Sequence, residues 1–277
     1  GIPMASCAVY EDFTSAGDFA ARWKTYTVGA GTLEPTGSTL CFVNANTTRR
    51  QTTNAQIDDY QGLSRRRYPW HPPLTMAVRA RFSHPAGRLS GTAGFGFWND
   101  PFMMTGRASL ALPRALWFFY ASPPSDMALA LDTPGSGWKA AALDATRPAA
   151  LAWASLAPLA VPLMNLRPLY RWLWPRIQRA LGICEAVLQV DMAAWHTYVL
   201  EWDADAVRCT VDGEPVLACD RSPRGPMGFV MWLDNQYLVA TPWGRFRYGR
   251  LETPGRQWME VDTLSIEPGP RSAPGGG

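Results

Sequence analysis

Three consecutive polar residues follow a strongly apolar run and are the strongest candidates for chemistry in this sequence. Asp234, Asn235 and Gln236 come directly after the run 229–233, in which Trp232 is the residue two before the acid. Polar side chains at the end of a core strand must find hydrogen-bond partners or a ligand. We predict that Asp234 acts as an acid or base and that Asn235 and Gln236 are catalytic groups that orient a ligand. The alternative is a turn whose side chains bind their own backbone.

A pair of carboxylates would instead indicate glycoside hydrolysis. Retaining glycosidases hold two carboxyl groups about 5 Å apart, and two such groups on one strand must be an even number of residues apart to share a face. Glu201 and Asp203 satisfy this spacing. Because Asp203 begins a polar turn, we rank this pair below Asp234.

Aromatic residues supply candidates for the walls of a site. Residues 91–100 read G-T-A-G-F-G-F-W-N-D, so Gly94 and Gly96 leave one face bare at alternate positions. Another sheet or a ligand can approach the backbone closely there. Residues 241–249 form a second aromatic segment, which also carries basic residues and which we expect to be a loop. The predicted ligand-binding residues are Trp98, Asn99, Trp117, Tyr120, Trp232, Trp243 and Arg245.

The elements that position these residues are predicted to be antiparallel strands. Apolar residues alternate with polar ones over 75–82 and 198–202, which is strand spacing. Asp212-Gly213 is a typical hairpin turn between two further strands. The expected strands cover 40–43, 75–82, 92–98, 116–122, 137–143, 198–202, 207–211, 215–218, 229–233 and 257–267.

One stretch resembles a known family. Residues 195–202 read W-H-x-Y-x-x-E-W, and a turn, a strand and V-D-G at 211–213 follow. This pattern is similar to the late strands of family 16 glycoside hydrolases, which belong to the concanavalin A-like lectin/glucanase superfamily. The resemblance covers about 75–142 and 186–266. It implies an all-β, two-sheet antiparallel jelly-roll sandwich, which we predict as a single domain over 4–267.

The resemblance does not extend to the catalytic motif of that family. The family's diagnostic strand carries Glu-x-Asp-x-x-Glu, which this sequence lacks, and the strand 116–122 expected in its place has no carboxylate. The family sometimes holds a structural calcium where the first and last strands meet, and Asp12 and Asp262 are conceivable ligands. Two separate acids are a weak signal, and we predict no metal site.

Residues 145–183 interrupt the strand pattern. The nineteen residues 148–166 carry no charge, and the segment between Ala145 and Cys184 contains five arginines and no acid. Apolar residues recur at helical spacing in its second half. We predict a mostly helical insertion, and we weigh a membrane span, a helix lying on a membrane surface and an apolar lid over the cleft. The lid, formed by 148–182, is the interpretation that we favour.

Composition limits the compartment and the partners. A net charge of +3 without a basic stripe argues against a nucleic-acid partner. The odd number of cysteines indicates reduced, mostly buried thiols, with a Cys7–Cys41 bridge as the alternative. No signal peptide follows Met4, so we expect a cytoplasmic protein unless such a peptide has been removed. Residues 268–277 are rich in Pro, Gly and Ser and are expected to be disordered.

These observations favour one function and leave two alternatives. We predict a small-molecule-binding protein or a cofactor-independent, non-hydrolytic enzyme of the isomerase or cyclase type. Its ligand would be large and mostly apolar, like a polyketide or terpenoid. The alternatives are a carbohydrate-active or carbohydrate-binding protein and a membrane-surface protein that uses 148–182. A closed apolar pocket would favour the first function, whereas an open groove across the concave face would favour a glycan.

Overall fold

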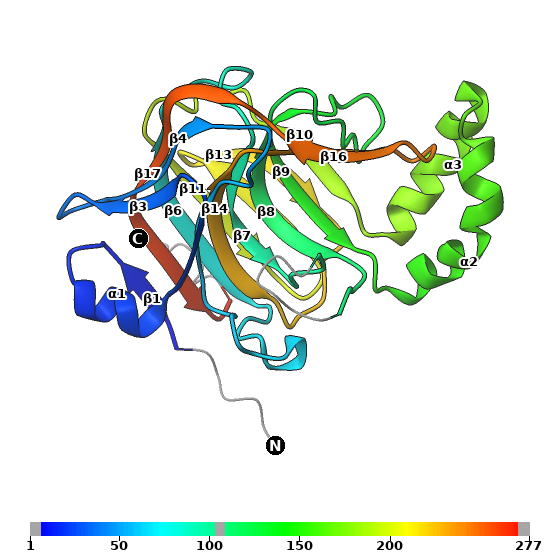
Figure 1. Cartoon of the computed structure of the whole chain (residues 1–277). Helices are drawn as coiled ribbons and strands as arrows, with labels where there is room; N and C mark the ends of the chain where they lie inside the picture. Colours follow the sequence, from blue (N-terminus) through cyan, green and yellow to red (C-terminus); the bar gives the residue numbers. More distant parts are fainter. Residues whose placement is uncertain (1–6, 103–108, 271–277) are drawn as a thin grey trace.

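The computed structural model describes residues 7–102 and 109–270, which form two large antiparallel sheets that pack face to face (Figure 1). Within these residues the first sheet runs β13 (Glu214–Cys219), β12 (Val207–Val211), β11 (His196–Trp202), β6 (Leu74–Phe82), β17 (Thr253–Pro268), β4 (Leu40–Thr47) and β3 (Gly31–Pro35), and β1 (Val9–Glu11) pairs with β17. The second sheet runs β10 (Cys184–Val187), β9 (Gly137–Asp144), β8 (Arg114–Ala121), β7 (Thr92–Trp98), β14 (Gly228–Asp234), β5 (Asn54–Asp58) and β2 (Lys24–Val28). The predicted jelly-roll sandwich is confirmed.

Aromatic side chains fill the space between the two sheets. The Trp138 ring of β9 lies 5.8 Å from that of Phe95 on β7 and 5.4 Å from that of Tyr198 on β11, both with edge-to-face geometry. Such pairs add stability beyond the area that they bury. The strand alternation seen in the sequence follows from this packing, since Met76 and Val78 of β6 point into the same core while Ala77 lies on the partly exposed face.

The centre of the second sheet is covered on both faces. All residues of β7 and all residues of β14 are buried. One face of each strand meets the first sheet, so the other face must be covered by something else. A smaller aromatic cluster that includes Tyr60, Trp98 and Trp232 lies on that second face.

The predicted helical insertion is present as two helices, α2 (Pro148–Leu163) and α3 (Arg167–Ala180), which project from one side of the sandwich (Figure 1). Pro148 and Pro168 stand in the first turns, where proline is tolerated because those backbone N–H groups have no intrahelical partner. No helix among the described residues is long and apolar enough to cross a membrane. Two shorter helices complete the fold, α1 (Ala16–Arg22) and the 3-10 helix η1 (Arg65–Arg67).

Residues 236–250 differ from the prediction. Instead of a loop at 241–249, they form a separate two-stranded hairpin of β15 (Gln236–Ala240) and β16 (Phe246–Arg250). The hairpin pairs with neither large sheet, and in β16 the aromatic residues Phe246 and Tyr248 alternate with Arg247 and Gly249, so that they share one face. Residues 271–277 of the predicted disordered tail lie outside the described residues.

The prediction of reduced cysteines is wrong for two of the five. Cys184, which begins β10, and Cys219, which ends β13, form a disulfide, while Cys7, Cys41 and Cys209 are free. Because β10 and β13 are edge strands of different sheets, this bond joins the two layers at one side of the sandwich. The sequence alone could not identify the pair, since its members come together only through the sheet order.

We expect the Cys184→Ser variant to unfold more easily than the wild type by about 3–4 kcal/mol, the loop-entropy value for a closed loop of this length. The two cysteines are 35 residues apart in the sequence. Urea unfolding with and without reductant measures the effect. A wild type whose unfolding midpoint does not respond to reductant would contradict the bond.

Candidate functional site

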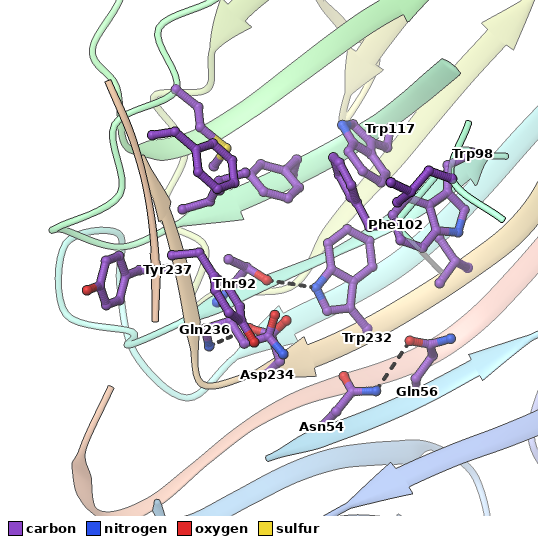
Figure 2. Close-up of a pocket in the computed structure, with 17 residues that line it drawn as sticks. Asn54, Gln56, Thr92, Trp98, Phe102, Trp117, Trp232, Asp234, Gln236 and Tyr237 are labelled. Atoms are coloured by element: carbon purple, nitrogen blue, oxygen red, sulfur yellow. Dashed lines mark hydrogen bonds between the residues drawn. The ribbon is translucent and has the colours of Figure 1, made fainter. Parts of the chain in front are cut away.

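A pocket of about 440 Å³ lies on the outer face of the second sheet, where β14, β7 and β8 meet the hairpin β15–β16 (Figure 2). Its volume is in the range of small-molecule sites. Most of its wall is apolar. The described residues that line it are Asn54, Gln56, Thr92, Trp98, Phe102, Leu110, Trp117, Phe119, Met127, Val230, Trp232, Asp234, Gln236, Tyr237, Leu238, Phe246 and Tyr248.

Strand β14 supplies the floor of the pocket through the alternation of its side chains. Phe229, Met231 and Leu233 belong to the core between the sheets. Val230, Trp232 and Asp234 therefore point to the opposite face and line the pocket. One face of β14 therefore belongs to the core, and its other face lines the pocket.

Gly91 lets the chain before β7 approach the backbone of Asp234. Its φ is +94°, and a Cβ at this position would lie 1.9 Å from the backbone oxygen of Asp234. A side chain here would push the two segments apart. As a result, the N–H of Thr92 donates to Asp234 Oδ1 at 3.0 Å.

The carboxyl of Asp234 is buried and is held by backbone donors. Its exposed fraction is 6 %. The N–H of Gln236 also donates to Oδ1, at 2.9 Å, so Oδ2 is the oxygen without a backbone donor among the described residues. Burial raises the pKa of Asp234 to about 6, although the hydrogen bonds from Gln236 and Thr92 act in the opposite direction. Near neutral pH this group can both hold and release a proton.

Three tryptophans form the aromatic wall (Figure 2). Trp232 Nε1 donates to Thr92 Oγ1 at 2.9 Å, and Trp98 Nε1 donates to Tyr60 Oη at 2.8 Å. The Trp117 ring lies 5.6 Å from that of Trp98 and 5.3 Å from that of Trp232. Because the indole N–H groups of Trp98 and Trp232 are already bonded to protein, these two rings offer mainly apolar surface to a ligand.

Gly94 and Gly96 of β7 make room for the neighbouring strand β8. A Cβ on Gly96 would lie 2.5 Å from the Cβ of Trp117 on β8, and one on Gly94 would lie 2.2 Å from the backbone oxygen of Phe118. Of the two causes that the sequence allowed, close packing of protein is therefore the one observed. The glycines contribute to the pocket indirectly, since they let Trp117 lean across β7.

A short polar ladder on β5 borders the aromatic wall. Asn54 Nδ2 donates to Gln56 Oε1 at 3.3 Å, and Gln56 Nε2 donates to Asp58 Oδ2 at 3.0 Å. Asn54 and Gln56 line the pocket, while Asp58 lies beyond its lining. These residues were not among the predicted site residues. Their N-x-Q-x-D spacing, which places all three on one face of a strand, is the sequence signal that could have found them.

The hairpin β15–β16 is the cover of the pocket. Tyr237 and Leu238 of β15 and Phe246 and Tyr248 of β16 line it. The hairpin turn rests on the helical insertion, where the ring of Trp243 packs 5.2 Å from that of Tyr170 on α3. These lining residues were missed because the segment was expected to be a loop.

The structure brings together five of the predicted site residues. Asp234, Gln236, Trp98, Trp117 and Trp232 all line the pocket. They come from four strands, β7, β8, β14 and β15, so their proximity depends on the order of strands in the second sheet and on the hairpin.

The other predicted residues lie elsewhere. Asn235 does not face the pocket, because its Oδ1 accepts from Thr53 N at 2.8 Å and its Nδ2 donates to the backbone oxygens of Thr48, Gln51 and Leu251. Its amide therefore ties together backbone segments that are distant in the sequence, whereas the local turn bond expected as the alternative is made by Asp234, which accepts from Gln236 N.

Four predicted ligand-binding residues also lie outside the lining. Asn99 is engaged with the backbone of Leu112 and Arg114. Tyr120 points into the core and donates to Leu89 O at 2.7 Å. Trp243 packs on the helices, and Arg245 is exposed at the hairpin turn.

The structure also corrects the prediction that residues 148–182 form a lid over the pocket. No residue of 148–182 is among the described residues that line the pocket. The helices instead support the hairpin that covers it. The candidate pair Glu201 and Asp203 is also remote, because β11 lies in the other sheet. Among the described residues no three His, Cys, Asp or Glu side chains gather as metal ligands.

We expect Asp234 to lower the stability of the protein as the pH rises. The folded state holds the proton up to about pH 6, whereas the unfolded chain releases it near pH 4. Stability therefore falls between pH 4 and pH 6, by at most about 3 kcal/mol, and then stays level. Asp234→Asn removes this step. The unfolding free energy of the variant minus that of the wild type, measured with urea at several pH values, should therefore rise between pH 4 and pH 6.

Asn235→Ala is the contrasting variant. It leaves three backbone groups without a side-chain partner, since Leu251 O still accepts from Thr47 Oγ1, and we expect a loss of about 2–3 kcal/mol that is the same at every pH. A difference curve for Asp234→Asn that is flat from pH 4 to pH 7 would contradict the raised pKa.

Comparison with known proteins shows the fold. No protein-family model and no curated protein matches the sequence. Among solved structures, a lichenase from a mouse hindgut metagenome has a TM-score of 0.51 at 12% identity, over 94% of this chain and 99% of its own. The apo Crh5 transglycosylase has a TM-score of 0.51 at 14% identity, over 96% and 85%. An endo-β-galactosidase from Clostridium perfringens that releases GlcNAcα1-4Gal has a TM-score of 0.52 at 12% identity, over 95% of this chain and 62% of that one, so the chain spans less than two thirds of it. The chain therefore has the jelly-roll sandwich fold of glucanases and transglycosylases.

Proposed function

We propose that the pocket binds a small, largely apolar molecule and that Asp234 exchanges a proton with it. The observation that carries this proposal is one buried carboxyl, with a pKa raised to about 6, in a pocket whose wall is otherwise mostly aromatic and aliphatic. A carboxyl that is half protonated near neutral pH is suited to acid or base catalysis. The surrounding rings would hold the ligand in a reactive conformation.

The reaction class that fits this arrangement is isomerisation or ring closure. Such a step needs a proton to be delivered or removed at one position and the rest of the ligand to be held still. Oδ2 of Asp234 would meet the reacting atom, because Oδ1 is occupied by the N–H groups of Thr92 and Gln236. A polyketide- or terpenoid-like molecule has the apolar surface that Trp117 and Phe119 would contact.

A carbohydrate ligand is the second candidate. The likeness in fold to glucanases and transglycosylases favours it, as do the tryptophan rings, which could stack on sugars. Hydrolysis with retention needs two carboxyl groups about 5 Å apart. Among the described residues that line the pocket, Asp234 is the one acid, so sugar binding fits this pocket better than glycoside hydrolysis.

We expect the pocket to bind the neutral dye N-phenylnaphthylamine, with an increase in its fluorescence. Trp117→Ala should weaken the binding about tenfold, because one wall of the pocket is lost. Trp195→Ala is the matched control, since Trp195 lies against Arg79 and Arg81 of the first sheet and outside the pocket. Dye displacement by laminarin or lichenan oligosaccharides, or release of reducing sugar from these glucans, would support the second candidate instead.

We expect Asp234→Asn to lower turnover of the natural ligand about 10²- to 10⁴-fold while dye binding is unchanged. Native mass spectrometry of protein purified from its own cells would identify the carried molecule to be used. For an acid role, the wild-type rate should fall as the pH rises through about 6. Turnover that survives in the variant would show that Asp234 has only a structural role.

A further inference from the structure

The helical insertion exposes apolar surface that no other described residue covers. In α2 the buried residues are Ala150 and Ala160. The exposed apolar side chains of the insertion, here called the docking face, are Leu151, Leu156, Leu159, Leu163, Leu166 and Trp172. Leu156 and Leu159 are 51% and 65% exposed. Leu151, Leu156, Leu159 and Leu163 lie on one side of α2 by helical spacing, and exposed apolar side chains gathered in this way indicate an interaction site.

The length of α2 excludes a transmembrane span as the role of this surface. Sixteen helical residues span about 24 Å, which is shorter than the hydrocarbon core of a bilayer, about 30 Å. The docking face also does not serve the pocket, since none of its residues lines it.

The charged side chains of the insertion itself are all basic. The segment between Ala145 and Cys184 carries five arginines and no acid. Arg171 is paired with Asp132 at 3.0 Å, and the Arg176 guanidinium lies over the ring of Trp172, 4.1 Å from its centre. Arg167 and Arg179 are exposed. A second copy of this chain on the same face would bring arginines against arginines, whereas an anionic surface would be complementary.

We propose that the docking face rests on a lipid bilayer that contains anionic lipids, with α2 lying in the plane of the interface. The leucines enter the boundary between headgroups and acyl chains, as in other interfacial helices. The arginines keep their charged ends among the anionic headgroups, which attract basic residues near the surface. Trp172 takes the interfacial position that tryptophan favours.

The docking face is connected to the pocket cover but does not depend on a ligand. Asn165 Nδ2, in the turn between α2 and α3, donates to the backbone oxygen of Trp243 at 3.1 Å. A Cβ on Gly244 would lie 2.8 Å from Val161, so the hairpin turn and α2 are in close contact. Membrane binding can therefore be tested in the empty protein, separately from the proposed function.

Sedimentation of the full chain with vesicles tests this proposal. We expect binding to vesicles of phosphatidylcholine with one quarter phosphatidylglycerol, weaker binding to phosphatidylcholine alone, and a decrease at high salt. Leu156→Gln combined with Leu159→Gln should weaken binding at least about tenfold, because two apolar side chains no longer enter the interface. Arg167→Gln combined with Arg179→Gln should reduce the preference for the anionic vesicles.

Tyr10→Gln is the matched control, because Tyr10 is 63% exposed on β1 and far from the insertion in the sequence. It should bind vesicles like the wild type, and all variants should keep the wild-type melting temperature. Equal sedimentation of the wild type and the leucine variant, or no sedimentation with either vesicle, would overturn the proposal. A dimer in sedimentation velocity that the leucine variant abolishes would assign the face to a second copy and would also overturn it.

Discussion

The alternation of side chains along β14 is the constraint on which both the core and the pocket depend. Phe229, Met231 and Leu233 fill the space between the sheets, so Val230, Trp232 and Asp234 must face the other way. Because successive side chains of a strand point to opposite faces, a shift of register by one residue would put the acid in the core. The ladders of β14 with β5 and β7 fix this register on both sides.

Burial of the Asp234 carboxyl costs stability, and the same burial makes it a candidate functional group. Desolvation of its charged form raises the pKa to about 6 and destabilises the folded protein above that pH. Two backbone N–H groups limit the cost, and Gly91 makes one of these contacts possible by its conformation. A buried acid with this support in an apolar pocket is a candidate functional group. Asn235, one residue later, is fully bonded to the backbone and has a structural role.

The hairpin forms one side of the pocket on the outer face of the second sheet, and the helical insertion contacts the turn of the hairpin. The hairpin β15–β16 closes over the aromatic wall, and the helices support its turn through Tyr170 and Trp243. A pocket that is partly open to solvent therefore occupies the outer face of the second sheet, since its lining residues Phe246 and Tyr248 are exposed. The same insertion carries exposed leucines, so one segment contacts the pocket cover and supplies the proposed membrane contact.

The sequence by itself determined ten of the strands, the two-layer architecture, the position of the helical insertion and five residues of the pocket. These features follow from local periodicity, from the apolar run before Asp234 and from a resemblance to family 16 glycoside hydrolases. The tertiary structure alone decided which neighbours meet. The Cys184–Cys219 bond depends on the order of strands in two sheets. The hairpin cover belongs to neither large sheet, and its turn packs on the helices through Trp243 and Tyr170. Asp234 and Asn235 have similar local sequence signals, and they differ because one side chain points into a cavity while the other meets the backbone of residues far away in the chain.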